Sequence, residues 1–254
     1  MILAINGILK GGVIETVGVS TLGLILYLDA SNPLSYPGTG TLWNDLSTAN
    51  NDGNLLNGAS YSSSNSGVIS LDSTDDYVDC GTGISSRGPQ ALTVSFWIKP
   101  SVYTGDVKFI MNLDYYAPYP IYFGAWINMW NDFGNGTYRL EASVGDGVFL
   151  YSQNRKSMYS TDGILVADSW KNITVVWENA QVAYIYCNGV PVSTYVGGGY
   201  NGTNLNWSGA GVAKIGNTTG STAPDQINDV LIYERALTAT EVLNNYNDKS
   251  SKYL

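Results

Sequence analysis

The chain has 254 residues, a formal net charge of −9 and no histidine. So acidic a surface repels phosphate backbones and anionic membranes, and we expect neither nucleic acid nor a membrane as a partner. The absence of histidine excludes a Ser-His-Asp catalytic triad and the usual zinc ligands. Cys80 and Cys187 lack the CxxC spacing of redox and zinc motifs. We expect two reduced thiols, since a disulfide between them would require export.

The first 23 residues are apolar, but Gly7, Gly11, Gly12 and Glu15 interrupt them. They contain no basic region and no small-residue cleavage site, and they are too interrupted to cross a bilayer. We therefore expect neither a signal peptide nor a membrane anchor. A free arm of this composition would expose an apolar patch. We predict that residues 1–23 form an N-terminal arm that pairs as a strand with a sheet edge of another chain. A first strand within the chain's own sheet is the alternative.

The segment "SLDSTDDYVDCG", residues 70–81, places four acids close together: Asp72, Asp75, Asp76 and Asp79. Such a cluster can serve as the carboxylates of an enzyme, as a metal site or as a turn. Hydrolysis of a glycosidic bond needs two carboxylates across the sugar, and none of the five Glu residues has another acid two positions away. Asp favours turns because its carboxylate accepts local backbone N–H groups. We predict a turn, and a bound metal ion there stays open.

Short β-rich segments separated by Gly, Asn, Asp and Ser predict an all-β sandwich for most of the chain. Residues 173–196 predict three strands, and Asn188-Gly189 is a strong signal for a hairpin turn between the second and the third. Residues 91–99 predict a strand with one apolar face, formed by Leu92, Val94, Phe96 and Ile98.

Only residues 235–247 have a helical pattern. Thr238 and Glu241 have the spacing of a capping box, which marks a helix start. The apolar stripe that follows consists of Val242, Leu243 and Tyr246. We therefore predict one short helix near the C-terminus.

An aromatic-rich segment covers residues 113–136. From Ile121, strand alternation places Ile121, Phe123, Ala125, Ile127 and Met129 on one face, which suits a core. The other face consists of Tyr122, Gly124, Trp126, Asn128 and Trp130. Flat aromatic rings suit the apolar face of a sugar, and Asn side chains bind hydroxyl groups. A subunit contact rich in Tyr and Trp, or a strand buried on both faces, would have the same pattern.

Four segments together resemble a known family. They are "GLILYLDASNPLSYPGTGTLWNDLS", "LDSTDDYVDCG", "LTVSFWIKP" and "INDVLIYERALTATEVLNNYN". In this order they resemble the laminin-G-like branch of the concanavalin A-like jelly rolls, and most of all the versions found in tailed-phage structural proteins. The resemblance covers residues 24–100 and 170–247. It implies an all-β, antiparallel two-sheet jelly-roll sandwich of about six or seven strands a sheet, one sheet concave and one convex. The laminin-G-like domain would cover residues 24–254, after the arm 1–23.

The resemblance also implies a calcium ion, because many relatives hold one where the first and last strands meet. The matching positions are Asp29, Asn228 and Asp229, which offer the oxygen ligands that calcium prefers. The alternative is that the two Asp side chains only accept hydrogen bonds from neighbouring backbone groups.

The fold alone does not assign a function, because it occurs in enzymes, lectins and scaffolds. We expect a non-catalytic structural or decoration protein of a tailed bacteriophage particle, located in the virion and assembled in the host cytoplasm. Its partners would be other virion proteins or copies of itself. The alternative is a carbohydrate-binding adhesion module of a tail or fibre. Its contacts with a cell-surface glycan would come from the concave face, through Tyr122, Trp126, Asn128 and Trp130. A glycoside hydrolase is a distant alternative.

Overall fold

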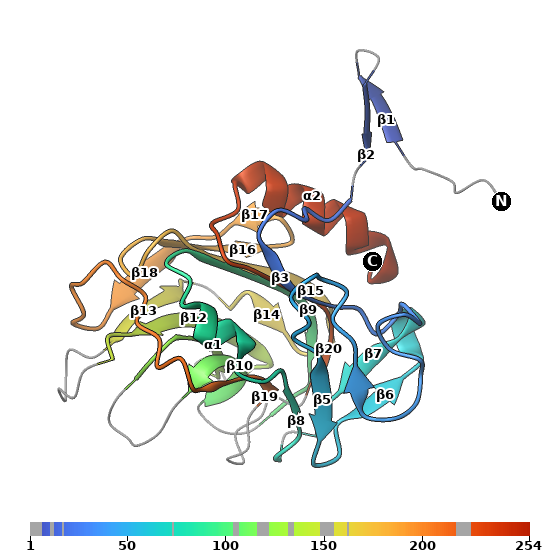
Figure 1. The fold of residues 1–254 in the computed structure, drawn as a ribbon, viewed down its shortest axis with the longest axis horizontal. Helices are drawn as coiled ribbons and strands as arrows, with labels where there is room; N and C mark the ends of the chain where they lie inside the picture. Colours follow the sequence, from blue (N-terminus) through green and yellow to red (C-terminus); the bar gives the residue numbers. More distant parts are fainter. Residues whose placement is uncertain are drawn as a thin grey trace.

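The computed structural model describes residues 7–10, 13–16, 18–72, 74–103, 107–115, 122–131, 135–147, 155–161, 163–216 and 225–254. Within these ranges the chain forms two large antiparallel sheets that pack face to face (Figure 1). Short helical turns are present at η1 (Ser64–Ser66), α1 (Gly83–Arg87) and η2 (Ser250–Lys252), and the longest helix is α2 (Ala239–Lys249). No helix in these ranges is long and apolar enough to cross a membrane. The predicted jelly-roll sandwich is confirmed.

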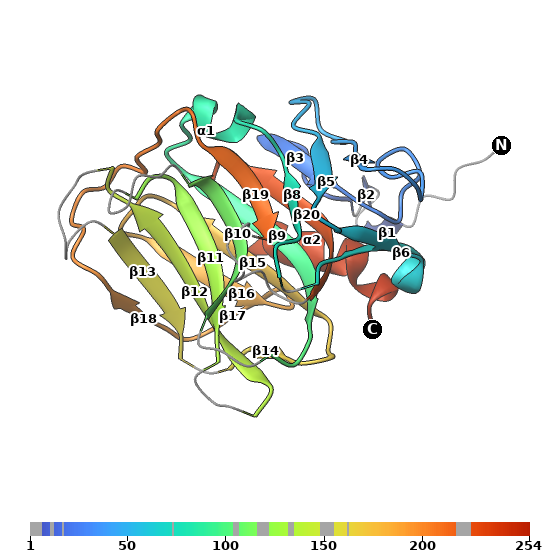
Figure 2. The ribbon, with the colours of Figure 1, turned by 90° about the horizontal axis from the view of Figure 1, so that it is seen from below.

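The first sheet has ten strands, more than the predicted six or seven. Figure 2 shows its strands β13, β12, β11, β10 and β19 running side by side. In spatial order the strands are β18 (Thr194–Gly197), β13 (Arg155–Ser160), β12 (Thr137–Gly145), β11 (Ala125–Trp130), β10 (Val107–Tyr115), β19 (Val212–Gly216), β8 (Tyr77–Asp79), β5 (Gly53–Leu56) and β4 (Leu42–Trp43), with β14 (Leu165–Val166) beside β12.

The second sheet has eight strands. In spatial order they are β17 (Val190–Pro191), β16 (Ala183–Cys187), β15 (Lys171–Trp177), β9 (Leu92–Pro100), β20 (Asp225–Tyr233), β7 (Val68–Ser70) and β6 (Ser60–Ser62), with β3 (Leu24–Leu28) beside β20. In both sheets a late strand pairs with a much earlier one: β19 lies between β10 and β8, and β20 lies beside β9. These long-range pairings close the sandwich.

Strand alternation builds the core between the sheets. The predicted apolar face of β9 is fully buried there, which confirms Leu92, Val94, Phe96 and Ile98 as core residues. From the opposite sheet, Ile127 and Met129 of β11 belong to the same cluster. Burying a side chain of this size contributes about 1.5–3 kcal/mol to stability.

The predicted hairpin turn is confirmed, whereas the strand after it differs from the prediction. Asn188 and Gly189 have φ values of 52° and 75°, the left-handed conformation that a two-residue hairpin turn requires. They join β16 to β17, which ends at Pro191. The chain then crosses to the other sheet, where β18 pairs with β13. The predicted third strand is therefore two short strands in different sheets.

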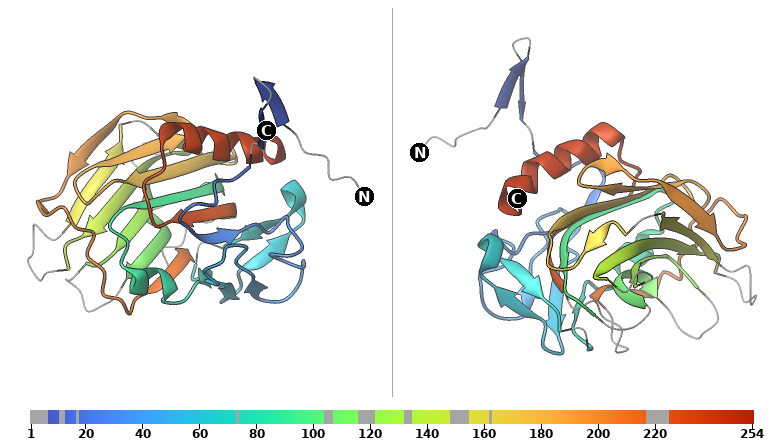
Figure 3. Two further views of the ribbon diagram at one scale, coloured as in Figure 1. Left: turned by 45° about the horizontal axis from the view of Figure 1, so that its top comes forward. Right: turned by 180° about the vertical axis from the view of Figure 1, so that it is seen from behind.

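The helix α2 lies across the outer face of the eight-stranded sheet (Figure 3). Its predicted capping box between Thr238 and Glu241 is present. Of the predicted apolar stripe, Val242 is fully buried and Tyr246 is half-buried, whereas Leu243 is 42% exposed. The polar face of β9 is covered here, because the Trp97 ring stacks on Tyr246 and on Tyr253 at centroid distances of 5.6 and 4.3 Å.

The N-terminal strands β1 (Gly7–Lys10) and β2 (Val13–Thr16) form a hairpin that stands apart from the sandwich (Figure 1). The chain joins the sandwich before residue 24. The Ser20 N–H donates to Asn245 Oδ1 at 3.1 Å, and Leu22 O accepts a 2.7 Å hydrogen bond from Arg235. The separate part is therefore shorter than the predicted arm 1–23.

Both cysteines are free thiols, as expected. Cys80 is buried directly after β8, and Cys187 lies half-buried in β16. Burial raises the pKa of each thiol, which makes the reactive thiolate form scarce.

The capping box provides a pH-dependent contribution to stability. Glu241 accepts hydrogen bonds from Arg235 at 2.5 and 3.0 Å and from the Thr238 N–H at 2.9 Å. The Arg235 bonds are the main cause of the fall in the Glu241 pKa from 4.5 to about 2. Burial acts in the opposite direction, and the Thr238 bonds lower the pKa further. A lowered pKa in the folded state stabilises the fold above the unfolded pKa, and this contribution disappears as pH falls towards the folded value.

We predict that Glu241→Gln lowers the free energy of unfolding at pH 7 by roughly 1–2 kcal/mol, after allowance for solvent screening of this partly exposed pair. Urea denaturation between pH 7 and pH 2 would measure it, and the difference from wild type should shrink below pH 4.5. Glu178→Gln, an exposed residue after β15, is the matched control. A loss that stays constant down to pH 2 would contradict the prediction.

Candidate functional site

A cleft of about 220 Å³ lies on the outer face of the ten-stranded sheet. It is formed where β10, β11 and β12 run side by side, with the start of β13 at one end. All four residues predicted to contact a glycan or partner lie in its wall. The lining residues are Val107, Phe109, Asn112, Tyr122, Trp126, Asn128, Trp130, Glu141 and Arg155.

Strand β11 supplies three of the predicted contact residues. Ala125, Ile127 and Met129 lie in the core, so the alternate residues face the cleft. This second face is itself well covered: Trp126 is 7% exposed and Asn128 is 4% exposed, whereas Trp130 is half-buried. The strand is therefore buried on one face by the core and shielded on the other by the cleft walls.

The strand alternation is predicted from Ile121, but the strand itself starts later, at Ala125. Gly124 has a φ of 66°, and a Cβ atom there would lie 1.9 Å from Leu113 O, so the backbone turns at a position that only glycine fits. The strand starts at Ala125. Phe123, predicted to be core, is half-buried outside the core cluster and lies against Gly147. Ile121 lies outside the described residues.

Tyr122 reaches the cleft from the loop before β11. A Cβ atom on Gly145 would lie 2.1 Å from Tyr122 O, so a glycine is needed where the loop crosses β12. The Gly147 N–H holds the same carbonyl at 2.9 Å. The Tyr122 ring lies 5.4 Å from the Trp126 ring at an angle of 31°, and together they form an aromatic corner.

Glu141 of β12 is the buried charge in the cleft wall. Its side chain accepts five hydrogen bonds although the residue is only 1% exposed. Burying an ionised carboxylate is costly unless such donors surround it. The donors to Oε2 are Trp130 Nε1 at 2.7 Å and Asn128 Nδ2 at 3.2 Å, and those to Oε1 are the hydroxyls of Ser143 at 2.8 Å, Ser157 at 3.0 Å and Tyr159 at 3.3 Å.

Asn128 is left with one unused group. It lies directly opposite Glu141 in the sheet register, and its amide NH₂ donates to that carboxylate. This bond fixes the orientation of the amide, so the carbonyl Oδ1 is the remaining polar atom of the side chain. Asn128 Oδ1 is buried and has no hydrogen-bond partner among the described protein atoms. An unsatisfied buried acceptor costs about 1–3 kcal/mol, and a ligand hydroxyl would remove that cost.

Sequence patterns do not single out Glu141, although a signal is present. Along β12, apolar core residues alternate with Arg139, Glu141 and Ser143, so a charge falls in the middle of a nine-residue strand. Arg155 and the lining residues of β10 have no comparable signal. They join the site because β10 and β13 flank the pair β11–β12, and neighbouring strands are not specified by local sequence.

The three predicted calcium ligands lie together, but an ammonium group lies between the carboxylates. A β-bulge in β20 with φ 46° at Asp229 places this residue near Asp29. Lys252 Nζ lies 3.0 Å from Asp29 Oδ2 and 3.1 Å from Asp229 Oδ2. The Asn228 amide is fully used, since it donates to Gly67 O at 2.8 Å and accepts from the Ala30 N–H at 2.7 Å.

The two carboxylates differ in protonation tendency. Burial, and then the charge of Asp29, raises the pKa of Asp229 to about 6. Burial alone would also raise the pKa of Asp29, but the Ser31 hydroxyl and Lys252 outweigh it and lower that pKa. The side chains do not fit a calcium ion unless Lys252 moves away. Calcium is what the resemblance implies here, whereas the arrangement of the side chains favours Lys252 as the cation.

We predict that EDTA and added calcium chloride leave the thermal midpoint unchanged, because Lys252 already supplies the positive charge. Lys252→Met should lower stability by up to about 3 kcal/mol, since it removes the nearest partner of two buried carboxylates. Thermal unfolding followed by circular dichroism tests both. A midpoint that falls in EDTA and recovers with calcium would instead establish the ion implied by the resemblance.

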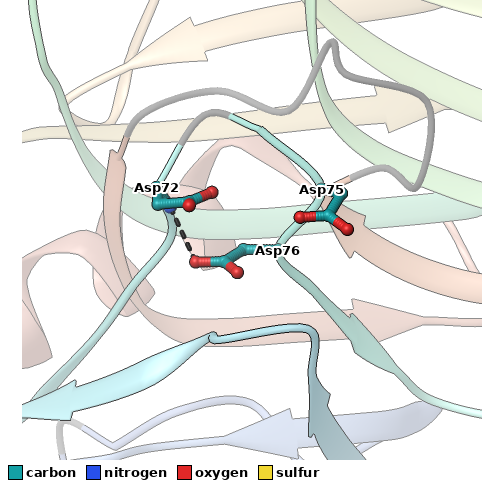
Figure 4. Close-up of side chains that lie close together, drawn as sticks. All are labelled: Asp72, Asp75 and Asp76. Atoms are coloured by element: carbon teal, nitrogen blue, oxygen red, sulfur yellow. Dashed lines mark hydrogen bonds between the residues drawn. The ribbon is translucent and has the colours of Figure 1, made fainter.

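The acid-rich loop connects β7 to β8 and crosses from one sheet to the other. The predicted turn is confirmed, because Asp76 Oδ2 accepts the Asp72 N–H at 2.8 Å (Figure 4) and Asp72 Oδ1 accepts the Thr74 N–H at 2.9 Å. After it, Asp79 Oδ1 accepts the Gly81 N–H at 2.8 Å. Carboxylate oxygens of Asp72, Asp75 and Asp76 lie within 4.8 Å of one another. Burial raises the pKa of Asp76.

The fold and the outer-face cleft define a lectin-type jelly roll. Residues 72–243 match the Laminin_G_3 family, described as the concanavalin A-like lectin/glucanases superfamily. The match covers more than half of the chain, and the chain belongs to this family. No curated protein sequence matches the chain.

Solved structures with little sequence identity have the same fold. The receptor-binding domain of botulinum neurotoxin C/D mosaic serotype has a TM-score of 0.62 and 17% identity, over 89% of this chain and 51% of that one. For the sialidase of Trypanosoma rangeli the TM-score is 0.64, the identity 13% and the coverage 96% and 35%. Domain 4 of the arabinanase AbnA from Geobacillus stearothermophilus has a TM-score of 0.59 and 15% identity, over 89% of this chain and 100% of that one. The chain thus spans about half of the neurotoxin domain and about a third of the sialidase.

Proposed function

We propose that this protein is a non-catalytic lectin-type module that binds a carbohydrate in the cleft beside β11. The observation that supports this most directly is the unpaired Asn128 Oδ1, a buried acceptor next to the aromatic corner of Tyr122 and Trp126. Sugars offer what this arrangement requires, namely hydroxyl donors beside an apolar ring face. The cleft of about 220 Å³ suits a ligand as small as one or two sugar rings.

Two similar structures make a carbohydrate ligand reasonable for this fold. The binding domain of botulinum neurotoxin DC was solved in complex with SialylT, and AbnA domain 4 was solved in complex with arabinotriose. These ligands belong to those proteins, which are 15% identical to this chain.

The absence of catalysis is part of the proposal. Among the described lining residues of the cleft, Glu141 is the single carboxylate. A glycoside hydrolase uses two carboxylates on opposite sides of the glycosidic bond. Both oxygens of Glu141 are also occupied by donors from the protein, which favours a role in organising the wall.

Binding to a glycan array, followed by calorimetry with a hit, tests the proposal. Trp130→Ala should weaken binding at least about ten-fold, equivalent to about 1.4 kcal/mol, because it removes an aromatic wall of the cleft. It also removes a donor to Glu141, so the thermal midpoint of the variant is measured to establish that it is folded. Trp130 is a better choice than Trp126, whose removal from a nearly closed environment would cost about 3–5 kcal/mol of stability.

Trp207→Ala is the matched control, because Trp207 is also half-buried but does not line the cleft. It should bind like the wild type. The proposal is wrong if the folded wild-type protein binds no glycan, or if Trp130→Ala binds as well as the Trp207 control.

The N-terminal hairpin favours a second, compatible role as an attachment device. Strands β1 and β2 pair with each other and, within the described residues, with no strand of the sandwich. An isolated two-stranded hairpin is marginal in water, so contact with another chain would stabilise it. On this proposal the partner is a second copy or a structural protein of a larger particle. The tailed-phage virion is the particle that the sequence resemblance suggests.

Deleting residues 2–17 tests the attachment role, because it spares the hydrogen bonds of Ser20 and Leu22 to the sandwich. We expect an unchanged thermal midpoint and loss of self-association or of incorporation into particles. Light scattering after size exclusion measures the former, and mass spectrometry of purified particles the latter. A truncated protein that assembles at normal occupancy would exclude this role.

A further inference from the structure

The described lining residues of the cleft include two charged side chains, Glu141 and Arg155. They differ in how many bonds they form with other groups of the protein. Glu141 is buried and surrounded by five donors. Arg155, at the start of β13, is partly exposed. Its guanidinium carbon lies 6.0 Å from the centroid of the Tyr122 ring, a cation–π distance. No described acidic residue forms an ion pair with it. No hydrogen bond between the described residues involves its guanidinium N–H groups, which leaves them to a ligand as far as these residues are concerned.

Two described acids lie near Arg155: Glu141 in the cleft wall, and Asp146, which follows Gly145, the register partner of Arg155. Neither of these described residues forms an ion pair with Arg155. Residues 148–154, which precede it, contain no Asp or Glu, and neither do residues 116–121, which precede Tyr122. The protein as a whole has a net charge of −9. Since charges are screened beyond about 8 Å at physiological ionic strength, the charges in the cleft matter more to a ligand than the net charge. Glu141 is already occupied by five protein donors, so Arg155 is the charge left to contact a ligand.

Three groups then set the chemistry of the ligand. The Tyr122–Trp126 corner accepts an apolar ring face, Asn128 Oδ1 requires a hydrogen-bond donor, and Arg155 requires an anion. A guanidinium group matches a carboxylate in a two-pronged geometry. We infer that the cleft binds an acidic sugar, whose carboxylate pairs with Arg155 while a hydroxyl group donates to Asn128. This inference rests on the proposed function and specifies its ligand class.

Calorimetry with matched sugar pairs tests the inference on the full chain. Glucuronate is compared with glucose, and 3′-sialyllactose with lactose, so that a uronic acid and a sialic acid are distinguished as sources of the carboxylate. The wild type should bind the acidic member of at least one pair about ten-fold more tightly or better, as expected for a charge-assisted contact. In Arg155→Gln this preference should disappear, and Arg155→Lys should retain part of it.

Lys156→Gln is the control, because it removes the same charge from the next residue, which does not line this cleft. It should keep the wild-type preference. Equal affinity for acidic and neutral sugars, or a preference that survives in Arg155→Gln, would overturn the inference and leave the proposed function intact. If neither member of any pair binds and the glycan array is also negative, both fail.

Discussion

The buried carboxylate of Glu141 is the constraint on which the cleft depends. Its five donors come from three adjacent strands, β11, β12 and β13. An ionised carboxylate in a closed environment is tolerated only while its donors stay in place, so it couples the register of these strands to one another. The same bonds orient the Trp130 indole and the Asn128 amide. The wall of the proposed binding cleft is therefore held in place by the protein's own bonds, which would reduce the entropy lost on binding a ligand.

The two outer faces of the sandwich differ because, among the described residues, the long helix α2 covers the eight-stranded sheet and no helix lines the cleft of the ten-stranded sheet. Over the eight-stranded sheet, α2 and the C-terminal residues bury Trp97 beneath two tyrosine rings. Some polar groups of that face are satisfied internally, as in the bond of 3.0 Å from Asn245 to the Tyr233 hydroxyl, whereas Trp97 Nε1 has no partner among the described residues. On the ten-stranded sheet, the same alternation of core and outward residues leaves aromatic and amide groups around the cleft. Strands of both sheets alternate core residues with outward polar and aromatic residues. The position of α2 decides which outer face is covered and which is the candidate binding face.

The cluster around Asp229 illustrates a site whose charge can be predicted but whose occupant cannot. Two acids near the meeting point of the first and last strands indicate that a cation neutralises them. The nearest cation is the ammonium of Lys252, which is 223 residues from Asp29 in the chain, and the ammonium of Lys249 lies 3.9 and 4.0 Å from the two carboxylates. A local motif cannot distinguish a distant lysine from a metal ion, because both satisfy the same carboxylates. Lys252 also ties the C-terminus to the first strand of the sandwich.

Local patterns in the sequence by themselves determined the class of fold and many of its parts. Period-two alternation identified the core face of β9 and the two faces of β11, and Asn188-Gly189 identified a hairpin turn. The capping box identified the start of α2. These features depend on residues a few positions apart, whose interactions are set by backbone geometry.

The tertiary structure decided which strands are neighbours, including the crossing of β18 to the other sheet and the return of β19 and β20. It also decided the composition of the cleft, since Glu141 meets Asn128, and Arg155 meets Tyr122, only through pairing between strands. Such pairings depend on the packing of the whole chain. The backbone hydrogen bonds of a sheet are nearly the same for any sequence, so they do not select which strands pair. The choice of partner strand comes from the side chains that are buried on both faces of the sheet.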